Sequence, residues 1–496
     1  MRGDSNERLT ILSEAEKTAL YGIPDFDDFQ RIEFFAMTEA ERALALQRRG
    51  ILKQAYCLLQ IGYFKAKQAF FQFSLDNVPP EDVAFLLQRY FPEKTLMVEP
   101  LSAKEYYAQR REIVALFGYR VWTDNDLPTL RDKAKLLART DVTPAFLLAE
   151  LLVYLIGQRI LRPGYTTLQT IIRDALSAER ERVEQLVEAA LTDTTRDALQ
   201  QLLVRENTLS DLAALKQDAK SFRYRQMGLE RQKRLTLAPL YAIAKALLPS
   251  LDLSQLNIAY YASLANFYTI YDLRRFKPGQ TNLYLLCYAW QRYRQLTDNV
   301  VEAFGYHTRQ LEDDTKAVAT QQAARIHNER QQATPRVGEL LLLYVDDTLT
   351  DVTPFGAVRH RSFRIMPEEK LRSTGKLLTS LPVSQMDLRW QAVDKQSGLC
   401  TKNLRPLAMA LDFASSSASG KVWLAALQWM KEVFARQQRL AKQPLAEIPP
   451  RAIPKRLRNF LQSFDQDGKP VGLRGDRYEF WVYRQLRKRL DARRSR

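Results

Sequence analysis

The chain has 496 residues, of which 46% are hydrophobic and 26% are charged. This length suits about three or four domains, and the composition is that of a folded protein rather than a disordered one. Charged residues interrupt every apolar run before the ~18 residues of a membrane helix, and the N-terminus lacks the apolar core of a secretory signal. Three cysteines and three histidines lie far apart without a CxxC pair, so we expect no disulfide framework, no zinc site and no other cofactor.

Basic residues are concentrated toward the C-terminus. The formal net charge is +17, and it divides into −3 over residues 1–200, +4 over residues 201–350 and +16 over residues 351–496. Such an asymmetry favours a polyanionic partner, most often nucleic acid. The alternative is a basic protein without such a partner, since net charge reports on association rather than on fold.

Helical periodicity dominates the chain. A helix is predicted after Val78, where two prolines and two acids precede an apolar face. Between Val183 and Leu191 the apolar residues recur at i, i+3, i+4, i+7 and i+8, which places them on one helical face. Glycines are few and alternating runs are rare, so we predict an all-α, multi-domain protein.

Breaks in composition suggest where the domains end. Arg162-Pro-Gly interrupts an apolar stretch, the polar residues 313–336 contain the helix breaker Pro335, and residues 412–420 are a serine-rich loop. Pro444, Pro449, Pro450 and Pro454 predict an extended linker before a basic C-terminal helix. The expected segments are 1–100, 101–165, 166–235 (a helical connector), 236–335, 336–443 and 444–496.

The first candidate DNA-binding segment runs from Arg42 to Lys67. It contains six basic residues and no acid, and Gly50 separates two helical patterns as in a helix-turn-helix. A basic helix after such a turn can enter a major groove, where arginine and lysine reach phosphates and bases. The alternative is a helical hairpin with a solvated basic face. The candidate contacts here are Arg48, Arg49, Lys53, Lys65 and Lys67.

Two further segments are candidates. Around a break at Gly118, Arg110, Arg111 and Arg120 lie among aromatic residues, although Glu105 and Glu112 partly offset their charge. An amphipathic helix from Tyr478 to Leu490 has an aromatic face for which no later partner is apparent; its alternative is a docked terminal helix. Its candidate phosphate contacts are Arg484, Arg487, Lys488 and Arg489.

Catalytic motifs are weak or missing. Tyr344-Val-Asp346-Asp347 matches a short metal-binding motif of reverse transcriptases. Its surroundings instead predict a helix that enters a turn, without the third carboxylate that a two-metal site needs. The sequence has no phosphate-cradling glycine loop, no HExxH and no GxSxG. We therefore expect no catalytic residues, and a magnesium-dependent enzyme built on these two aspartates is a minor alternative.

Several motifs, in order, resemble the opening half of Tn-three family transposases. They include Tyr21-Gly-Ile-Pro, Arg48-Arg-Gly, Arg110-Arg-Glu-Ile, Arg162-Pro-Gly-Tyr-Thr-Thr-Leu and Tyr478-Glu-Phe-Trp-Val-Tyr, and the resemblance extends from about Leu12 to Leu490. It implies tandem helix-turn-helix modules, in 1–100 and 101–165, that bind the terminal inverted repeats of a transposon. It also implies later helical regions for further DNA binding and dimerisation, and a catalytic domain beyond this chain.

The resemblance sets the functional expectation. We expect a bacterial, cytoplasmic, nucleoid-associated protein that binds double-stranded DNA at transposon ends and has no membrane partner. It is not expected to cut DNA, because the chain stops before the catalytic domain. The sequence leaves the oligomeric state open between a homodimer and a mixed dimer with full-length transposase. Two alternatives stay open: a protein that forms inactive mixed dimers with full-length transposase, and a decayed fragment without a role.

Overall fold

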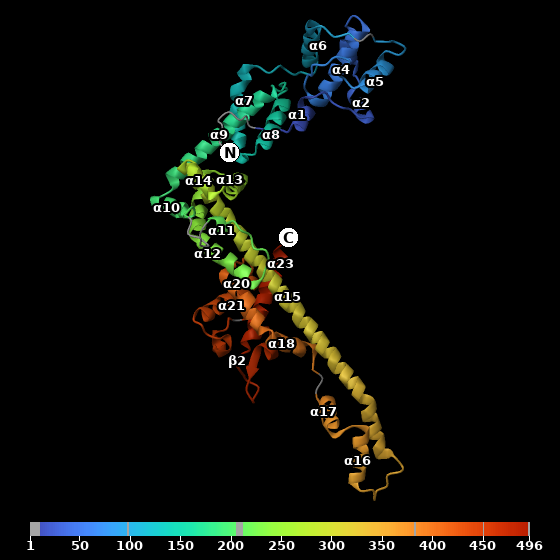
Figure 1. Ribbon diagram of the computed structural model, residues 1–496, viewed down its shortest axis with the longest axis vertical. Coiled ribbons are helices and arrows are strands. Elements are labelled where there is room, and N and C mark those ends of the chain that lie inside the picture. The colour runs from blue at the N-terminus through green and yellow to red at the C-terminus, as the bar shows by residue number, and fades with distance from the viewer. Residues whose placement is uncertain (1–9, 97–98, 205–211, 381–382, 450, 495–496) are drawn as a thin grey trace. The chain divides into compact units, whose positions relative to one another are not determined.

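The computed structural model describes residues 10–96, 99–204, 212–380, 383–449 and 451–494. The chain divides into two compact units, unit 1 with residues 1–205 and 239–291, and unit 2 with residues 206–238 and 292–496. Helices make up almost all of the regular structure, and the strands in the described part form one two-stranded sheet (Figure 1). The predicted all-α fold is confirmed. None of the described helices is both long and apolar enough to cross a membrane.

The first core of unit 1 lies among α2 to α6. Two of its helices, α2 and α3, and the preceding helix α1 begin at side-chain caps that satisfy free backbone N–H groups. Ser13, Asp27 and Thr38 complete a capping box for α1, α2 and α3 in turn. The helix bounds are α1 (Glu14–Tyr21), α2 (Asp28–Phe34), α3 (Glu39–Leu46), α4 (Ile51–Lys67), α5 (Pro80–Tyr90) and α6 (Ala103–Leu116).

Helix α4 is the centre of this core. Its residues Ala55 to Phe64 are all buried, as expected for a helix that neighbours cover on every side. Gly62 lets the ring of Phe35 approach so closely that a Cβ there would lie 2.2 Å from the ring. Asp82 of α5 is fully buried and accepts hydrogen bonds from Tyr63 and Arg31, each at 2.8 Å.

A second core of unit 1 lies among α7, α8 and α9. Apolar residues such as Leu151 of α8 and Ile172 of α9 are fully buried there. Asn257 of α13 joins the end of α7, because its side chain accepts from the N–H of Val142 and donates to the carbonyl of Ala138, both at 2.9 Å. The bounds are α7 (Leu127–Thr140), α8 (Pro144–Gly157), α9 (Tyr165–Ala190), α10 (Asp193–Gln201), α13 (Gln255–Phe267) and α14 (Ile270–Arg275).

The two cores do not follow the segment boundaries expected from the sequence. Helix α6, placed in segment 101–165, packs into the first core through Ile113 and Val114. The first half of α9, placed in the connector, packs against α7 and α8. Composition marks where helices break, but it does not show which apolar faces meet.

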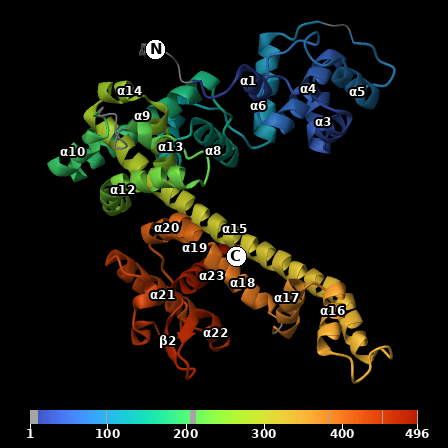
Figure 2. The same ribbon diagram turned by 60° about the horizontal axis from the view of Figure 1, so that its bottom comes forward.

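Unit 2 contains most of a 65-residue helix, α15 (Pro278–Leu342). Pro335 lies inside this helix, so the polar residues 313–336 continue a helix instead of ending a domain. Helices α16 and α17 lie beside the C-terminal part of α15 (Figures 1 and 2), where Arg330 donates to the carbonyl of Ser380 at 3.1 Å. The further bounds are α11 (Leu212–Leu215), α12 (Tyr224–Leu247), α16 (Phe355–Ile365), α17 (Glu368–Thr379), α18 (Gln385–Lys395), α19 (Ser397–Leu399), α20 (Arg405–Ala410) and α21 (Ala418–Ala435).

The core of unit 2 forms around the last helix, α23 (Gly475–Arg494). Tyr478, Phe480 and Tyr483 are buried against residues of α15, α18 and α21. The aromatic face of this helix is therefore covered, which corrects the expectation that it lacks a partner. Just before it, α22 (Arg458–Leu461) leads into strands β1 (Gln462–Phe464) and β2 (Pro470–Leu473), which pair antiparallel with Gln462 opposite Leu473.

The expected proline-rich linker packs on this core. Leu440, Ala452 and Leu457 are buried in it, and short 3₁₀ turns at 440–442, 445–447 and 455–457 connect them. Pro444 and Pro454 each lie directly before a turn, since their fixed φ suits that position. Pro450 lies outside the described residues.

Candidate nucleic-acid interface

The turn between α3 and α4 has the predicted glycine. Gly50 adopts a φ of +92°, a backbone conformation that other residues rarely reach. The N-terminus of α4 has no side-chain cap, so its first N–H groups and the helix dipole are available to an anion. Arg49 is exposed beside this turn and has no carboxylate partner in the described part of the chain.

Helix α4 itself cannot enter a groove. Because Ala55 to Phe64 are buried, only the two ends of α4, residues 51–54 and 65–67, are partly exposed. This corrects the expected helix-turn-helix geometry, in which α4 would be the reading helix: its aromatic residues form the core. Any contact of this module with DNA would involve the Arg49 turn.

Arg48 brings the first and second candidate segments together. Its guanidinium forms ion pairs with Glu105 and Glu112 of α6, and its side chain is only 12% exposed. Lys53 also lies 3.6 Å from Glu105. Arg48 therefore holds α6 against the α3–α4 turn, and its charge is neutralised within the fold.

The two lysines at the end of α4 turn toward the protein. Lys65 donates to the carbonyl of Ala36 at 2.7 Å and lies 3.3 Å from Glu41. Lys67 donates to the carbonyl of Ala19 in α1. Both lysines are partly exposed, but their ammonium groups are bound by the protein.

The second candidate segment offers one free cation. The guanidinium of Arg110 lies over the ring of Phe70 at 5.1 Å, and Arg120 forms an ion pair with Asp126. Arg111 is exposed and has no ion-pair partner among the described residues. Arg49 and Arg111 are therefore the free predicted cations on the first core.

The predicted cations of α23 mostly face inward. Arg484 and Arg487 both contact Glu312 of α15, at 2.6 and 3.1 Å, and Arg389 of α18 contacts the same carboxylate at 3.2 Å. Arg489 lies over the ring of Trp423 at 5.4 Å, whereas Lys488 is exposed.

Glu312 is the acidic centre of this arginine cluster. Its side chain is 11% exposed, and that burial raises its pKa. The hydrogen bond from Arg484 and the charges of Arg484, Arg487 and Arg389 outweigh burial, so the pKa lies below its ordinary value. The cluster joins α15, α18 and α23 and is structural in character.

A dense group of free cations lies just before α23, in a segment that we call the basic loop layer (residues 436–474). It carries three acids, Glu447, Asp465 and Asp467, against nine basic residues. All nine basic side chains are exposed, and none has an ion-pair partner among the described residues. They are Arg436, Arg439, Lys442, Arg451, Lys455, Arg456, Arg458, Lys469 and Arg474.

Apolar residues hold this layer in place. Leu457, Leu461 and Leu473 point into the core of unit 2, and the N–H of Arg474 donates to the carbonyl of Leu461 at 2.8 Å. The β1–β2 hairpin extends away from α21 and α23 (Figure 1), and Val471 on it is 60% exposed. Each of the nine basic side chains is therefore exposed on a segment whose described residues are anchored to the core of unit 2.

The sequence predicted the basic C-terminal part of the chain, but the nine exposed cations of the basic loop layer lie outside the residues that it predicted as DNA contacts. The prolines suggested a linker, so the nine cations between Arg436 and Arg474 were not chosen as site residues. The available signal was the alternation of isolated leucines with basic residues in Lys455-Arg-Leu457-Arg-Asn-Phe-Leu461.

The aspartates near the end of α15 do not form a metal site. Helix α15 ends at Leu342 and a short 3₁₀ turn follows, as the sequence predicted. Asp346 accepts hydrogen bonds from Thr348, which lower its pKa, and lies 3.4 Å from Arg361. Over the described residues, no group of three or more histidine, cysteine or acidic side chains could hold a metal ion.

Sequence comparison finds a family that matches the N-terminal part of the chain. Residues 11–175 match a family model described as a domain of unknown function, DUF4158. The match covers about a third of the chain, and it includes the first core of unit 1 and the second core as far as the middle of α9. No curated protein matches the chain. Residues 11–175 are thus similar to DUF4158 domains.

Proposed function

We propose that this chain binds double-stranded DNA at the terminal inverted repeats of a transposon, as part of a Tn-three family transposase. The observation that carries DNA binding is the basic loop layer, where nine exposed cations have no carboxylate partner in the described structure. Phosphate contacts by lysine and arginine supply most of the sequence-independent affinity for DNA. Nine such side chains on a fixed backbone suit a long polyanion better than a small anion.

The transposase assignment has separate support. The DUF4158 domain is found in Tn-three family transposases, and the ordered motifs from Tyr21 to Tyr483 resemble that family. In unit 1 the Arg49 turn offers a free cation next to the uncapped N-terminus of α4, a combination that favours a phosphate oxygen.

Two measurements test the two parts of this proposal. A salt titration of binding to an arbitrary duplex tests affinity for DNA: a steep loss of affinity with salt is expected, and no binding at low salt would contradict the proposal. Selection from a pool of random duplexes tests end recognition, with enrichment of one repeated motif as the expected result. Recovery of an unbiased pool would reject end recognition, whereas the proposal that the chain binds DNA would still hold.

A second candidate function is pairing with another copy of a related chain, either as a homodimer or as a mixed dimer with full-length transposase. Large apolar side chains are exposed where α15 ends and α16 begins, and exposed apolar clusters of this kind favour protein contacts. They are Leu341, Leu342, Tyr344, Val345, Val352 and Phe355. Light scattering should give a dimer that Val345→Asp with Phe355→Asp converts to a monomer; a monomeric parent chain would exclude self-pairing.

A further inference from the structure

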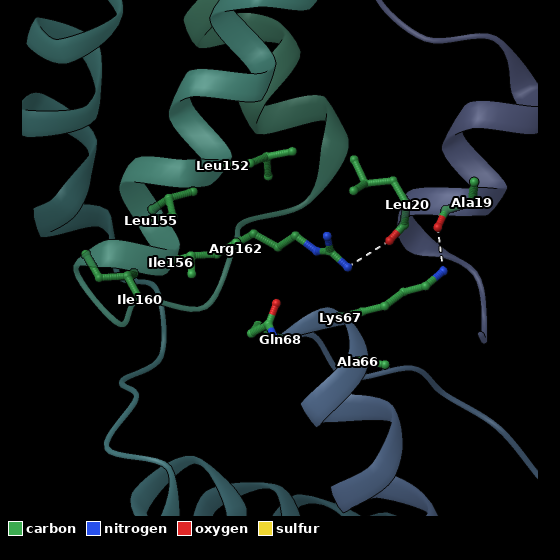
Figure 3. A pocket seen from close by; sticks show the side chains of 10 residues that line it. All are labelled: Ala19, Leu20, Ala66, Lys67, Gln68, Leu152, Leu155, Ile156, Ile160 and Arg162. Atoms are coloured by element: carbon green, nitrogen blue, oxygen red, sulfur yellow. Dashed lines mark hydrogen bonds between the residues drawn. The ribbon is translucent and has the colours of Figure 1, made fainter. Parts of the chain in front are cut away.

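A cavity in unit 1 combines two positive charges with an aliphatic wall. Its volume is about 270 Å³, and it lies among the end of α1, the end of α4 and α8 (Figure 3). Leu152, Leu155, Ile156 and Ile160 form one side, Lys67 reaches in from the end of α4, and Arg162 extends from the segment after α8 toward α1. None of the ten residues that line it is acidic.

Among the described residues, both cations donate hydrogen bonds to backbone carbonyls and have no carboxylate partner, and the guanidinium of Arg162 also lies 5.0 Å from the ring centre of Tyr21. Arg162 donates to the carbonyl of Leu20 at 2.7 Å, and Lys67 donates to that of Ala19 (Figure 3). These carbonyls belong to the last turn of α1, which has no basic residue of its own. The two side chains thus cap α1, but a carbonyl carries only a partial charge and neutralises neither cation.

The charge in the cavity is unbalanced. Burial lowers the pKa of Arg162, and burial together with the charge of Arg162 lowers the pKa of Lys67. The Nε atom of Arg162 is buried and has no hydrogen-bond acceptor among the described residues. Lys67 and Arg162 are both partly buried, and charges withdrawn from water are normally paired in proteins, so an anion at this position would lower the electrostatic cost of holding the two cations together.

The apolar wall indicates which kind of anion would fit the cavity. A DNA phosphate would bring a sugar and further charge against four aliphatic side chains, whereas a carboxylate on an aliphatic body would satisfy both sides of the cavity. Small-ligand sites commonly combine apolar walls with a few placed polar groups, at volumes of roughly 300 Å³ and above.

We propose that this cavity binds a small organic carboxylate, with the carboxylate between Lys67 and Arg162 and an aliphatic body against α8. The site is independent of the DNA-binding surfaces, because it uses none of the free cations of the basic loop layer or of the Arg49 turn. A failure of DNA binding would leave it untouched.

Calorimetric titration of the full chain without DNA tests the proposal. Hexanoate is the probe, hexanamide is its neutral analogue, and acetate lacks the aliphatic body. Saturable binding of hexanoate is expected. Hexanamide should bind at least about tenfold more weakly because it loses the charged hydrogen bond. Acetate should also bind at least about tenfold more weakly because it loses several buried methylenes. Equal affinity for hexanoate and hexanamide, or no binding of hexanoate, would overturn the proposal whatever the variants do.

Substitutions then locate the site. Arg162→Gln should weaken hexanoate binding by about tenfold or more. Ile156→Thr should reduce the difference in affinity between hexanoate and acetate. Arg139→Gln, which removes an exposed charge at the end of α7, is the matched control and should change neither affinity. If Arg139→Gln weakened hexanoate binding as much as Arg162→Gln, binding would follow net charge and the site would be wrong.

Discussion

Helix α4 and the basic loop layer place their basic residues in opposite ways. The helix is rich in aromatic residues and follows a glycine turn, as a DNA-reading helix would, yet ten of its consecutive residues are buried and its last two lysines face the protein. The loop layer is broken by prolines, yet all nine of its cations face solvent. Charge density in a sequence therefore does not locate a binding surface until burial and ion pairing are known.

The largest effect is expected from neutralising the loop layer. Replacing Arg451, Lys455, Arg456 and Arg458 by glutamine removes up to four phosphate contacts, so the log–log salt slope of DNA binding should become shallower by about 3.6. At about 0.1 M salt, affinity should fall by up to about a thousandfold. Titrations with a labelled duplex at several salt concentrations give both quantities.

The control for that variant removes the same charge elsewhere. Arg131, Lys135, Arg139 and Arg173 are exposed on α7 and α9, and their replacement by glutamine should change the slope little. Equal losses in the two variants would mean that net charge, rather than the loop layer, determines binding.

The next effect concerns the interior of α4. Leu59 is fully buried, so Leu59→Ala should lower the free energy of unfolding by about 2–5 kcal/mol through lost contacts and a residual cavity. Leu46, which is 51% exposed at the end of α3, is the control, and Leu46→Ala should cost within about 0.5 kcal/mol. Urea unfolding followed by circular dichroism measures both; similar small losses would contradict the core position of α4.

The arginine cluster of unit 2 should matter to stability rather than to DNA. Glu312→Gln leaves three arginines without their shared carboxylate and should cost about 3 kcal/mol of unfolding free energy. DNA affinity of the folded variant should not fall, because none of these cations is counted among the phosphate contacts. A loss of DNA binding in folded protein would place the interface at α23 after all.

The carboxylate of Glu312 should also make the free energy of unfolding depend on pH. Since the pKa of Glu312 is lower in the folded protein than its ordinary value of about 4.3, its contribution to stability is complete above that ordinary value. The contribution is lost as the pH falls from about 5 through the lowered folded pKa. Urea unfolding at several acidic pH values should show a weaker pH dependence for Glu312→Gln than for the parent chain.

The smallest expected effect concerns the thiol of Cys57, which should not react with a disulfide reagent in the folded protein. Cys57 lies in the buried part of α4, and burial raises the pKa of its thiol to about 12. The thiol should therefore stay protonated and inaccessible to a disulfide reagent at pH 8, and all three cysteines should react after unfolding in urea. Rapid labelling of Cys57 in the native protein would show that α4 opens easily.

Local rules predicted the helices well, whereas the candidate site depended on contacts that they do not describe. Apolar periodicity and turn chemistry gave the all-α fold, the glycine turn before α4 and the helix that ends near Asp346. They could not show that Arg48 lies between Glu105 and Glu112, or that Arg484 and Arg487 share Glu312, because these partners are distant in sequence. Pro335 also broke the rule that proline ends a helix.

Helix α1 should detach from unit 1 more easily than the helices behind it. It contains no buried residue, and Lys67 and Arg162 hold its final carbonyls. Detaching it would expose little apolar surface, so this segment should open at a lower free energy than the helices behind it. Its backbone amides should exchange with deuterium early, and a protease should cut the chain near it while both cores of unit 1 are still intact.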